Sequence, residues 1–152
     1  MQRMNELVVP DSIERIVVFT ASVDRVWAAL TDPVQLVKWF GDGAEVELRP
    51  GGRALFSFGE ERCPAIIEAV EPMSRFAFWW QPGPSEMQPE LPIDDRTLVE
   101  FTLSATEDGG TRLRVLESGF AVLRNPVAAR YTAHEEGWEE ELAELVTYLH
   151  QG

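Results

Sequence analysis

The chain has 152 residues, 45% of them hydrophobic, and carries a formal net charge of −13. This length is ordinary for a single domain with a sizeable core. Nucleic-acid binding requires clustered lysine and arginine side chains that neutralise phosphates, so the acidic balance excludes it, and an anionic membrane surface is disfavoured for the same reason. The acidity favours solubility instead.

Targeting and redox features are few. The N-terminus lacks the long apolar core of a signal peptide, and no stretch is long enough to cross a membrane. The single cysteine, Cys63, cannot form an internal disulfide and is expected to be a small buried or half-buried side chain. We therefore expect a cytoplasmic protein.

The first part of the chain predicts an N-terminal arm, a strand and two short helices. Residues 1–12 form the arm, and β-branched residues predict a strand over 13–19. Ser22 can cap a helix over 23–30. Asp32 and Pro33 supply a cap and a preformed first residue for a second helix, which ends at 39–41.

Three hairpins follow in series, which predicts an antiparallel meander. Their paired strands are expected at 44–48 with 53–58, 65–70 with 75–80, and 97–105 with 111–117. A proline-rich segment, 81–92, separates the second hairpin from the third and is long for such a connection. The sequence leaves two interpretations of it open, a flexible insertion or a flap near a ligand entrance.

A long amphipathic helix is predicted from after Pro126 to about Leu149. Its apolar stripe contains Tyr131, Trp138, Leu142, Leu145 and Leu149. Gly137 within it costs about 1 kcal/mol relative to alanine, so a close approach to a strand or a local bend is expected there. The fold class is α+β, with one domain over 13–152 and a sheet packed on this helix.

Several short motifs together resemble one known family. They are residues 21–33, Lys38-Trp39-Phe40-Gly41, Arg49-Pro50-Gly51-Gly52, Glu117-Ser118-Gly119-Phe120 and Glu136-Gly137-Trp138. From about Ile13 to Leu149 the chain is similar to the activator of heat-shock-protein-90 ATPase homologue group of the START-like, or SRPBCC, superfamily, which includes the birch pollen allergen fold. The resemblance implies a helix-grip fold: a curved antiparallel sheet around the C-terminal helix, two short helices closing one end, and an apolar cavity between sheet and helix.

Inward-facing side chains are the candidates for a ligand-binding wall, because alternation places aromatic residues on the concave face. The predicted ligand-binding residues are Trp39, Phe56, Phe58, Phe78, Trp80, Val99, Phe101, Glu117, Tyr131, His134 and Trp138. Aromatic walls suit planar apolar ligands. The same rings would also fill a core against the helix, and the sequence leaves both interpretations open.

Glu117 and His134 are weak candidates for catalysis. Alternation turns Glu117 inward, where a carboxylate needs a partner or a proton. It would then anchor a ligand or act as a general base with a raised pKa, whereas an earlier strand end would leave it at a solvated rim. His134 lies on or beside the apolar stripe, as a packed or rim residue or as a proton shuttle paired with Glu117.

The leading functional hypothesis is a protein that binds, and thereby sequesters, a small apolar or aromatic molecule such as a lipid or polyketide. One alternative is a cyclase or hydrolase that uses Glu117 and His134. Another is a heat-shock-protein-90 co-chaperone, which the short segment before the fold argues against, since the eukaryotic activators carry a separate N-terminal domain. Two histidines and one cysteine offer no metal-ligand spacing, so neither a metal nor a cofactor is expected. A homodimer is left open.

Overall fold

The computed structural model of the protein describes residues 9–84 and 88–150. Most of the predicted arm, residues 1–8, lies outside the described residues, as does the stretch 85–87 of the proline-rich segment.

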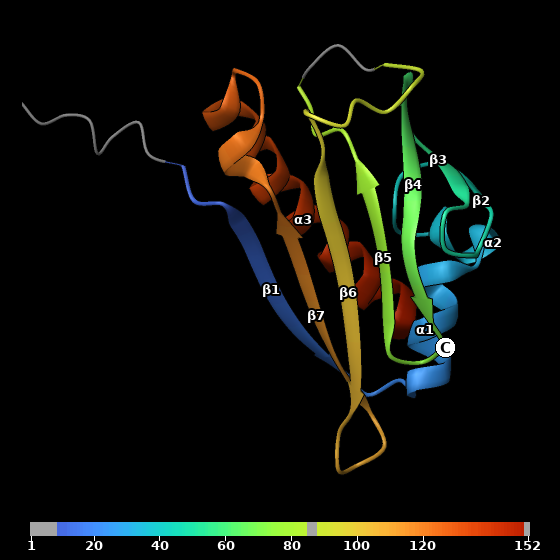
Figure 1. Cartoon of the computed structure of the whole chain (residues 1–152). Helices are drawn as coiled ribbons and strands as arrows, with labels where there is room; N and C mark the ends of the chain where they lie inside the picture. Colours follow the sequence, from blue (N-terminus) through green and yellow to red (C-terminus); the bar gives the residue numbers. More distant parts are fainter. Residues whose placement is uncertain (1–8, 85–87, 151–152) are drawn as a thin grey trace, which may run out of the picture.

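Seven strands form one curved antiparallel sheet in the order β1-β7-β6-β5-β4-β3-β2 (Figure 1). They are β1 (Ser12–Phe19), β2 (Gly43–Val46), β3 (Arg53–Phe58), β4 (Glu61–Glu71), β5 (Arg75–Trp80), β6 (Thr97–Ala105) and β7 (Thr111–Ser118). All three predicted hairpins form, and the pairings of β3 with β4 and of β5 with β6 make the meander continuous from β2 to β7. β1 pairs with β7 and so forms the edge opposite β2.

Two short helices, α1 (Val23–Thr31) and α2 (Pro33–Leu36), connect these two edges. The Ser22 side chain accepts a hydrogen bond from the Arg25 N–H, and Asp32 accepts one from the Val34 N–H, which confirms both predicted caps. α2 ends earlier than the predicted 39–41, because the N–H groups of Lys38 and Trp39 bond to carbonyls three residues back, in turns instead of a continued helix.

The long helix α3 (Val127–His150) lies against the concave face of the sheet, after a short helical turn η2 (Phe120–Val122) (Figure 1). Four residues of its predicted apolar stripe are buried, and Tyr131 is half-buried. The α+β helix-grip architecture expected from the sequence is therefore confirmed. Within the described part of the chain, no helix is long and apolar enough to cross a membrane.

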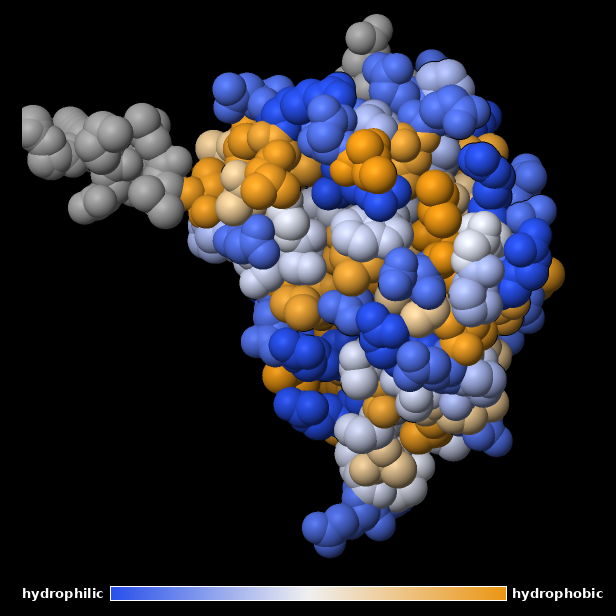
Figure 2. Space-filling model, viewed as in Figure 1, coloured by the Kyte–Doolittle hydropathy of each residue, from blue (hydrophilic) through white to orange (hydrophobic). Residues whose placement is uncertain are grey.

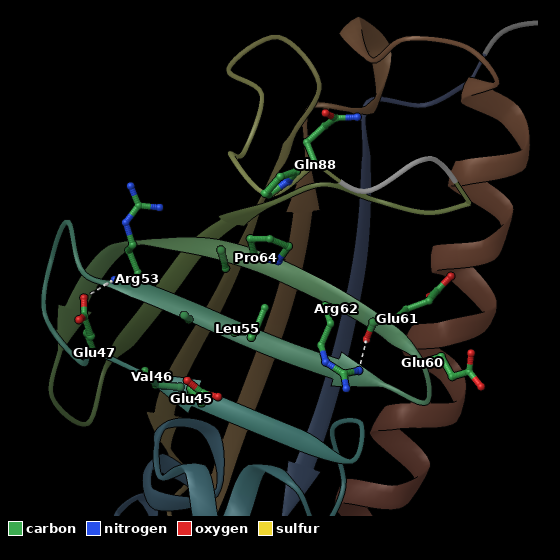
Figure 3. A pocket seen from close by; sticks show the side chains of 13 residues that line it. Glu45, Val46, Glu47, Arg53, Leu55, Glu60, Glu61, Arg62, Pro64 and Gln88 are labelled. Carbon is green, nitrogen blue, oxygen red and sulfur yellow. Dashed lines mark hydrogen bonds between the residues drawn. The ribbon is translucent and has the colours of Figure 1, made fainter.

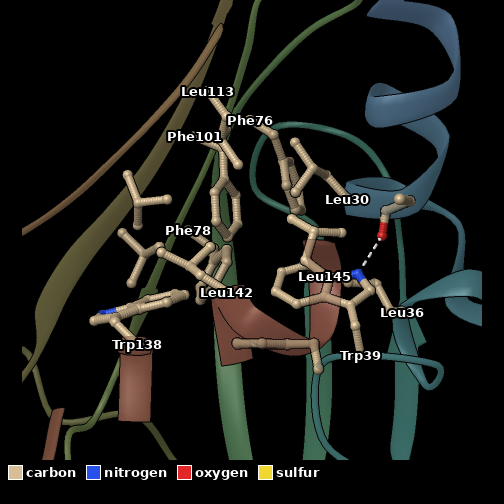
Figure 4. Close-up of a cluster of buried hydrophobic side chains, with 14 of the residues drawn as sticks. Leu30, Leu36, Trp39, Phe76, Phe78, Phe101, Leu113, Trp138, Leu142 and Leu145 are labelled. Carbon is tan, nitrogen blue, oxygen red and sulfur yellow. Dashed lines mark hydrogen bonds between the residues drawn. The ribbon is translucent and has the colours of Figure 1, made fainter. Parts of the chain in front are cut away.

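The core fills the space between the sheet and α3, as Figure 4 shows for one of its clusters. Phe76 and Phe101 stack with ring centroids 6.2 Å apart, and Phe78 packs against both. The side chains of Leu142 and Leu145 reach this cluster from α3. Each such side chain contributes about 1.5–3 kcal/mol through burial. For these strands, the interpretation of the rings as core filling holds.

Most of the outer face of the sheet is hydrophilic, with apolar side chains scattered between the polar ones (Figure 2). The exposed large apolar residues include Ile16, Val18, Val34, Leu48, Met73, Ile93 and Val122. This surface agrees with the strongly acidic composition of the chain.

Candidate functional site

A fully buried carboxylate, that of Glu117, lies between the sheet and α3. Its Oε1 atom is 2.8 Å from both His134 Nδ1 and Trp138 Nε1. Its Oε2 atom accepts hydrogen bonds from Trp80 Nε1 at 2.8 Å and from the Thr97 hydroxyl at 2.6 Å. Glu117 therefore points inward, as strand alternation predicted, and does not lie at a solvated rim.

The hydrogen bonds of His134 define its tautomer. Its Nε2 atom accepts from the Gly83 backbone N–H at 3.3 Å, so the ring proton lies on Nδ1 and is donated to Glu117. Burial raises the pKa of Glu117, but the adjoining His134 ring and the hydrogen bonds from His134, Thr97 and Trp80 outweigh it and hold this pKa below its ordinary value. Glu117 is thus an ionised anchor for the side chains around it, and the alternative of a general base with a raised pKa is wrong.

A pocket of about 410 Å³ opens beside this cluster, between β3, β4, the start of the proline-rich segment and α3. Its walls include the aromatic side chains of Phe40, Phe58, Trp80 and Trp138. The other described residues that line it are Glu61, Cys63, Gln81, Gly83, Pro84, Ala133, His134, Gly137 and Glu141. Its size and its mostly apolar wall with four aromatic side chains are typical of small-molecule sites, which span about 300–1,000 Å³.

The pocket brings together four of the predicted ligand-binding residues, namely Phe58, Trp80, His134 and Trp138. The others do not line it: Trp39, Phe56, Phe78, Val99 and Phe101 are core residues, and Glu117 lies behind the wall. Trp39 is held there by a 2.8 Å hydrogen bond from its indole N–H to the Ala29 carbonyl. Tyr131 packs against Phe120 and donates to the Ser12 carbonyl at 3.0 Å.

Two glycines lie at or next to the residues that line the pocket, Gly137 in its wall and Gly41 beside Phe40. Gly41 has a φ of +74°, and a Cβ there would lie 2.3 Å from the Ser57 carbonyl oxygen, so only glycine fits. A Cβ at Gly137 would meet nothing within 4 Å, so the close approach to a strand that the sequence suggested is absent. Gly137 instead leaves space on the helix face that lines the pocket.

Two carboxylates, those of Glu61 and Glu141, and the Cys63 thiol also line the pocket. Burial raises the pKa of Glu141 to about 7, with Glu140 and Glu144 acting in the same direction and a hydrogen bond from the Gly41 N–H acting against them. Burial, and then the neighbouring Glu61, raises the pKa of the Cys63 thiol to about 11. Cys63 is therefore almost entirely protonated at neutral pH and is a poor nucleophile.

A buried ion pair anchors the proline-rich segment at its base. The Arg130 guanidinium makes two hydrogen bonds to the Asp95 carboxylate, of 2.8 and 3.1 Å, and a third to the Pro82 carbonyl at 2.9 Å. Asp95 also accepts from the Gln81 side chain at 2.9 Å. This network holds Gln81 and Pro82 in place, and Gln81 lines the pocket.

A second, larger hollow of about 900 Å³ lies on the outer face of β2, β3 and β4 (Figure 3). By volume alone this hollow would be the better candidate for a ligand site. Its surroundings are mainly charged and polar, however, with Glu45, Glu47, Arg53 and Arg62 among its lining residues. A small apolar ligand gains little there, because affinity in such sites comes from enclosed apolar surface. The pocket beside α3 is therefore the candidate site.

A curved sheet that grips a long helix, with a pocket at one end of the aromatic core, defines the START-like class of proteins. The sequence model of the family described as "Activator of Hsp90 ATPase homolog 1-like protein" matches residues 20–150. The chain therefore belongs to this family, and the resemblance seen in its sequence motifs is confirmed.

Solved structures agree with this assignment. Protein MLL2253 from Mesorhizobium loti superposes with a TM-score of 0.77 at 23% identity, covering 92% of this chain and 97% of that one. The Aha1 dimer from Colwellia psychrerythraea superposes with a TM-score of 0.70 at 21% identity, covering 91% and 95%. At these identities the likeness establishes the fold alone.

A third similar structure is DynU16, described as a putative protein in the dynemicin biosynthetic locus. It has a TM-score of 0.74 and 25% identity, over 93% of this chain and 48% of DynU16. Among functionally curated proteins, none matches the chain.

Proposed function

We propose that this protein binds a small apolar or aromatic molecule in the pocket between the sheet and α3. The observation that carries the proposal is the aromatic wall formed by Phe40, Phe58, Trp80 and Trp138 around about 410 Å³ of space. Ring faces supply large contact areas for a planar ligand, and burial contributes about 25 cal/mol per Å² of apolar surface.

The indole positions support this proposal, because Glu117 accepts from the N–H groups of both Trp80 and Trp138. The two rings that line the pocket are thereby held before any ligand arrives, and a preorganised wall loses less entropy on binding. The similarity to a protein of the dynemicin biosynthetic locus agrees with a secondary-metabolite ligand.

The proposal is tested by native mass spectrometry of the purified protein, followed by denaturing extraction and identification of whatever is bound. A stoichiometric apolar compound is the expected result. In a Gly137→Leu variant, the new side chain should occupy the open space and abolish binding. The matched control, Gly137→Ala, should keep binding and gain up to about 1 kcal/mol of stability. Full binding by a folded Gly137→Leu variant, or a wild-type protein that retains no compound, would contradict the proposal.

A proton-transfer enzyme is a second candidate, and one observation favours it. His134 lines the pocket, its Nδ1 is held by the buried Glu117, and among the described residues its Nε2 receives only the long contact from the Gly83 N–H. A histidine oriented by a carboxylate is the usual arrangement of a general base. If the protein is an enzyme, wild type should convert its ligand into a product of different mass, and a His134→Gln variant should not form that product. Identical compounds from both proteins would exclude this role.

A further inference from the structure

We infer that the pocket selects aromatic ligands that carry a positively charged group, such as a protonated amine, over neutral or anionic ones of the same shape. This inference rests on the proposed function and adds the charge class of the ligand. It follows from which charged side chains line the pocket and from what those side chains contact.

The charged groups at the pocket have one sign. Glu61 from β4 and Glu141 from α3 are carboxylates, and the described residues that line the pocket include no lysine or arginine. Figure 3 shows the Glu61 side chain extending from its strand towards α3. A cation that enters between the sheet and the helix therefore has a carboxylate on either side.

Neither carboxylate is neutralised by the protein. Most arginines of the described chain have acidic partners: Arg15, Arg49, Arg75, Arg114, Arg124 and Arg130 all form ion pairs. Among residues 9–84 and 88–150, in contrast, neither Glu61 nor Glu141 forms one. The Gly41 N–H is the one hydrogen-bond donor to Glu141 that the described structure provides.

The electrostatic state of Glu141 supports the same conclusion. Burial, with Glu140 and Glu144 on the same helix, raises its pKa to about 7, which means that the surroundings disfavour its negative charge. A ligand cation would supply the missing countercharge. The ring faces of Trp80 and Trp138 add to the selection, because an aromatic face attracts organic cations and discriminates against anions.

The experiment compares three naphthalene probes of similar size: naphthylmethylamine as the cation, naphthylmethanol as its neutral isostere and naphthoate as the anion. Binding is measured by isothermal titration calorimetry at physiological ionic strength. We expect the amine to bind about tenfold more tightly than the alcohol, and naphthoate more weakly than both. The double variant Glu61→Gln/Glu141→Gln should bind amine and alcohol alike.

A matched double variant, Glu45→Gln/Glu107→Gln, separates local selection from the general attraction of an acidic protein for cations. It changes the net charge by the same amount at two exposed residues that do not line the pocket. It should keep the full preference for the amine.

Equal affinities of wild type for amine and alcohol would overturn the inference and leave the proposed function standing. An equal loss of preference in both double variants would overturn it as well. Failure of all three probes to bind wild type would overturn both the inference and the proposed binding of aromatic molecules.

Discussion

Glu117 concentrates four hydrogen-bonding partners on one buried carboxylate, so its replacement should destabilise the whole sheet–helix contact. A Glu117→Gln variant places an amide NH₂ where two donors point at an oxygen. We expect a loss of about 3 kcal/mol in the free energy of unfolding, measured by urea denaturation. The exposed Glu45→Gln change should stay within about 0.5 kcal/mol of wild type.

The contribution of Glu117 to stability should also depend on pH, and it should decrease as the pH falls. The pKa of this carboxyl is lower in the folded protein than the ordinary value of 4.5, so its contribution is complete above pH 4.5 and is lost as pH falls further. The difference in the free energy of unfolding between wild type and Glu117→Gln should therefore become smaller below pH 4.5. A loss under about 1 kcal/mol at neutral pH would contradict the role of Glu117 as a structural anchor.

The effect of Glu141 on stability depends on pH in the opposite direction to that of Glu117. Its pKa is about 7 in the folded protein against an ordinary 4.5, so the folded state binds the proton more tightly and stability falls as pH rises from 4.5 to 7. Burial is the main cause, Glu140 and Glu144 add negative charge around it, and the Gly41 N–H acts against them. The penalty is complete above pH 7.

A Glu141→Gln variant removes this penalty. Since the side chain is partly solvated, we expect a gain of about 1 kcal/mol in the free energy of unfolding at about pH 8 and no difference near pH 4. Urea denaturation at the two pH values measures both. Glu139→Gln, at an exposed residue of the same helix, controls for the change in net charge and should show no such pH-dependent difference. A destabilised Glu141→Gln variant at pH 8 would show that the carboxylate is stabilised by contacts in the folded protein.

At the scale of elements, the proline-rich segment depends on α3 through Arg130. The Arg130–Asp95 pair is almost completely buried, with side-chain exposures of 1% and 4%. Removal of one partner leaves an uncompensated charge, so Arg130→Met should cost about 3–5 kcal/mol. It should also speed amide hydrogen exchange at Gln81 and Gly83, the two residues of 81–84 that carry a backbone N–H, because the Arg130 contacts hold this stretch in place.

Two comparisons make this prediction specific. Arg124 pairs with Asp94 on the surface, so Arg124→Met should cost under about 1 kcal/mol. The double change Arg130→Met/Asp95→Leu should be milder than Arg130→Met alone, because apolar replacements can substitute for a buried pair. Unchanged amide exchange at Gln81 and Gly83 in Arg130→Met would exclude the anchoring role.

The order of elements could be predicted because each depends on local signals. Alternating and helical periodicity placed the strands and α3, and caps at Ser22 and Asp32 placed α1 and the start of α2. Strand alternation also turned Glu117 inward correctly. The end of α2 was wrong, because the turns after Leu36 depend on the packing of Trp39 and Phe40, which sequence periodicity does not report.

The site was harder to predict because it depends on contacts between distant residues. Trp80, Thr97 and Trp138 meet at Glu117 across three elements, and of the four partners of this carboxylate the sequence analysis named only His134. The Arg130–Asp95 pair was missed, although an arginine in the first turn of an amphipathic helix was a signal to examine. Glu141 and Gly137 were missed as wall residues, because a pocket is what packing leaves unfilled.

At the scale of the whole molecule, charge repulsion should limit stability at low salt. The chain has 26 acidic residues against 13 basic ones. Several ion pairs lie at the surface, such as Arg49–Glu47 and Arg124–Asp94, and contribute little. Screening should therefore relieve more repulsion than it removes attraction, so the melting temperature should rise between low salt and about 0.3 M NaCl.

We expect this rise to correspond to about 1 kcal/mol, or roughly 2–4 °C for a domain of this size, in thermal unfolding followed by circular dichroism. A variant with Glu107, Glu136 and Glu139 each changed to glutamine removes three exposed negative charges. It should melt higher than wild type at low salt and respond less to NaCl, because part of the repulsion is already gone. A melting temperature that falls with salt in wild type would mean that the surface ion pairs outweigh the acidic excess, and that this family member uses its charge for stability as well as for solubility.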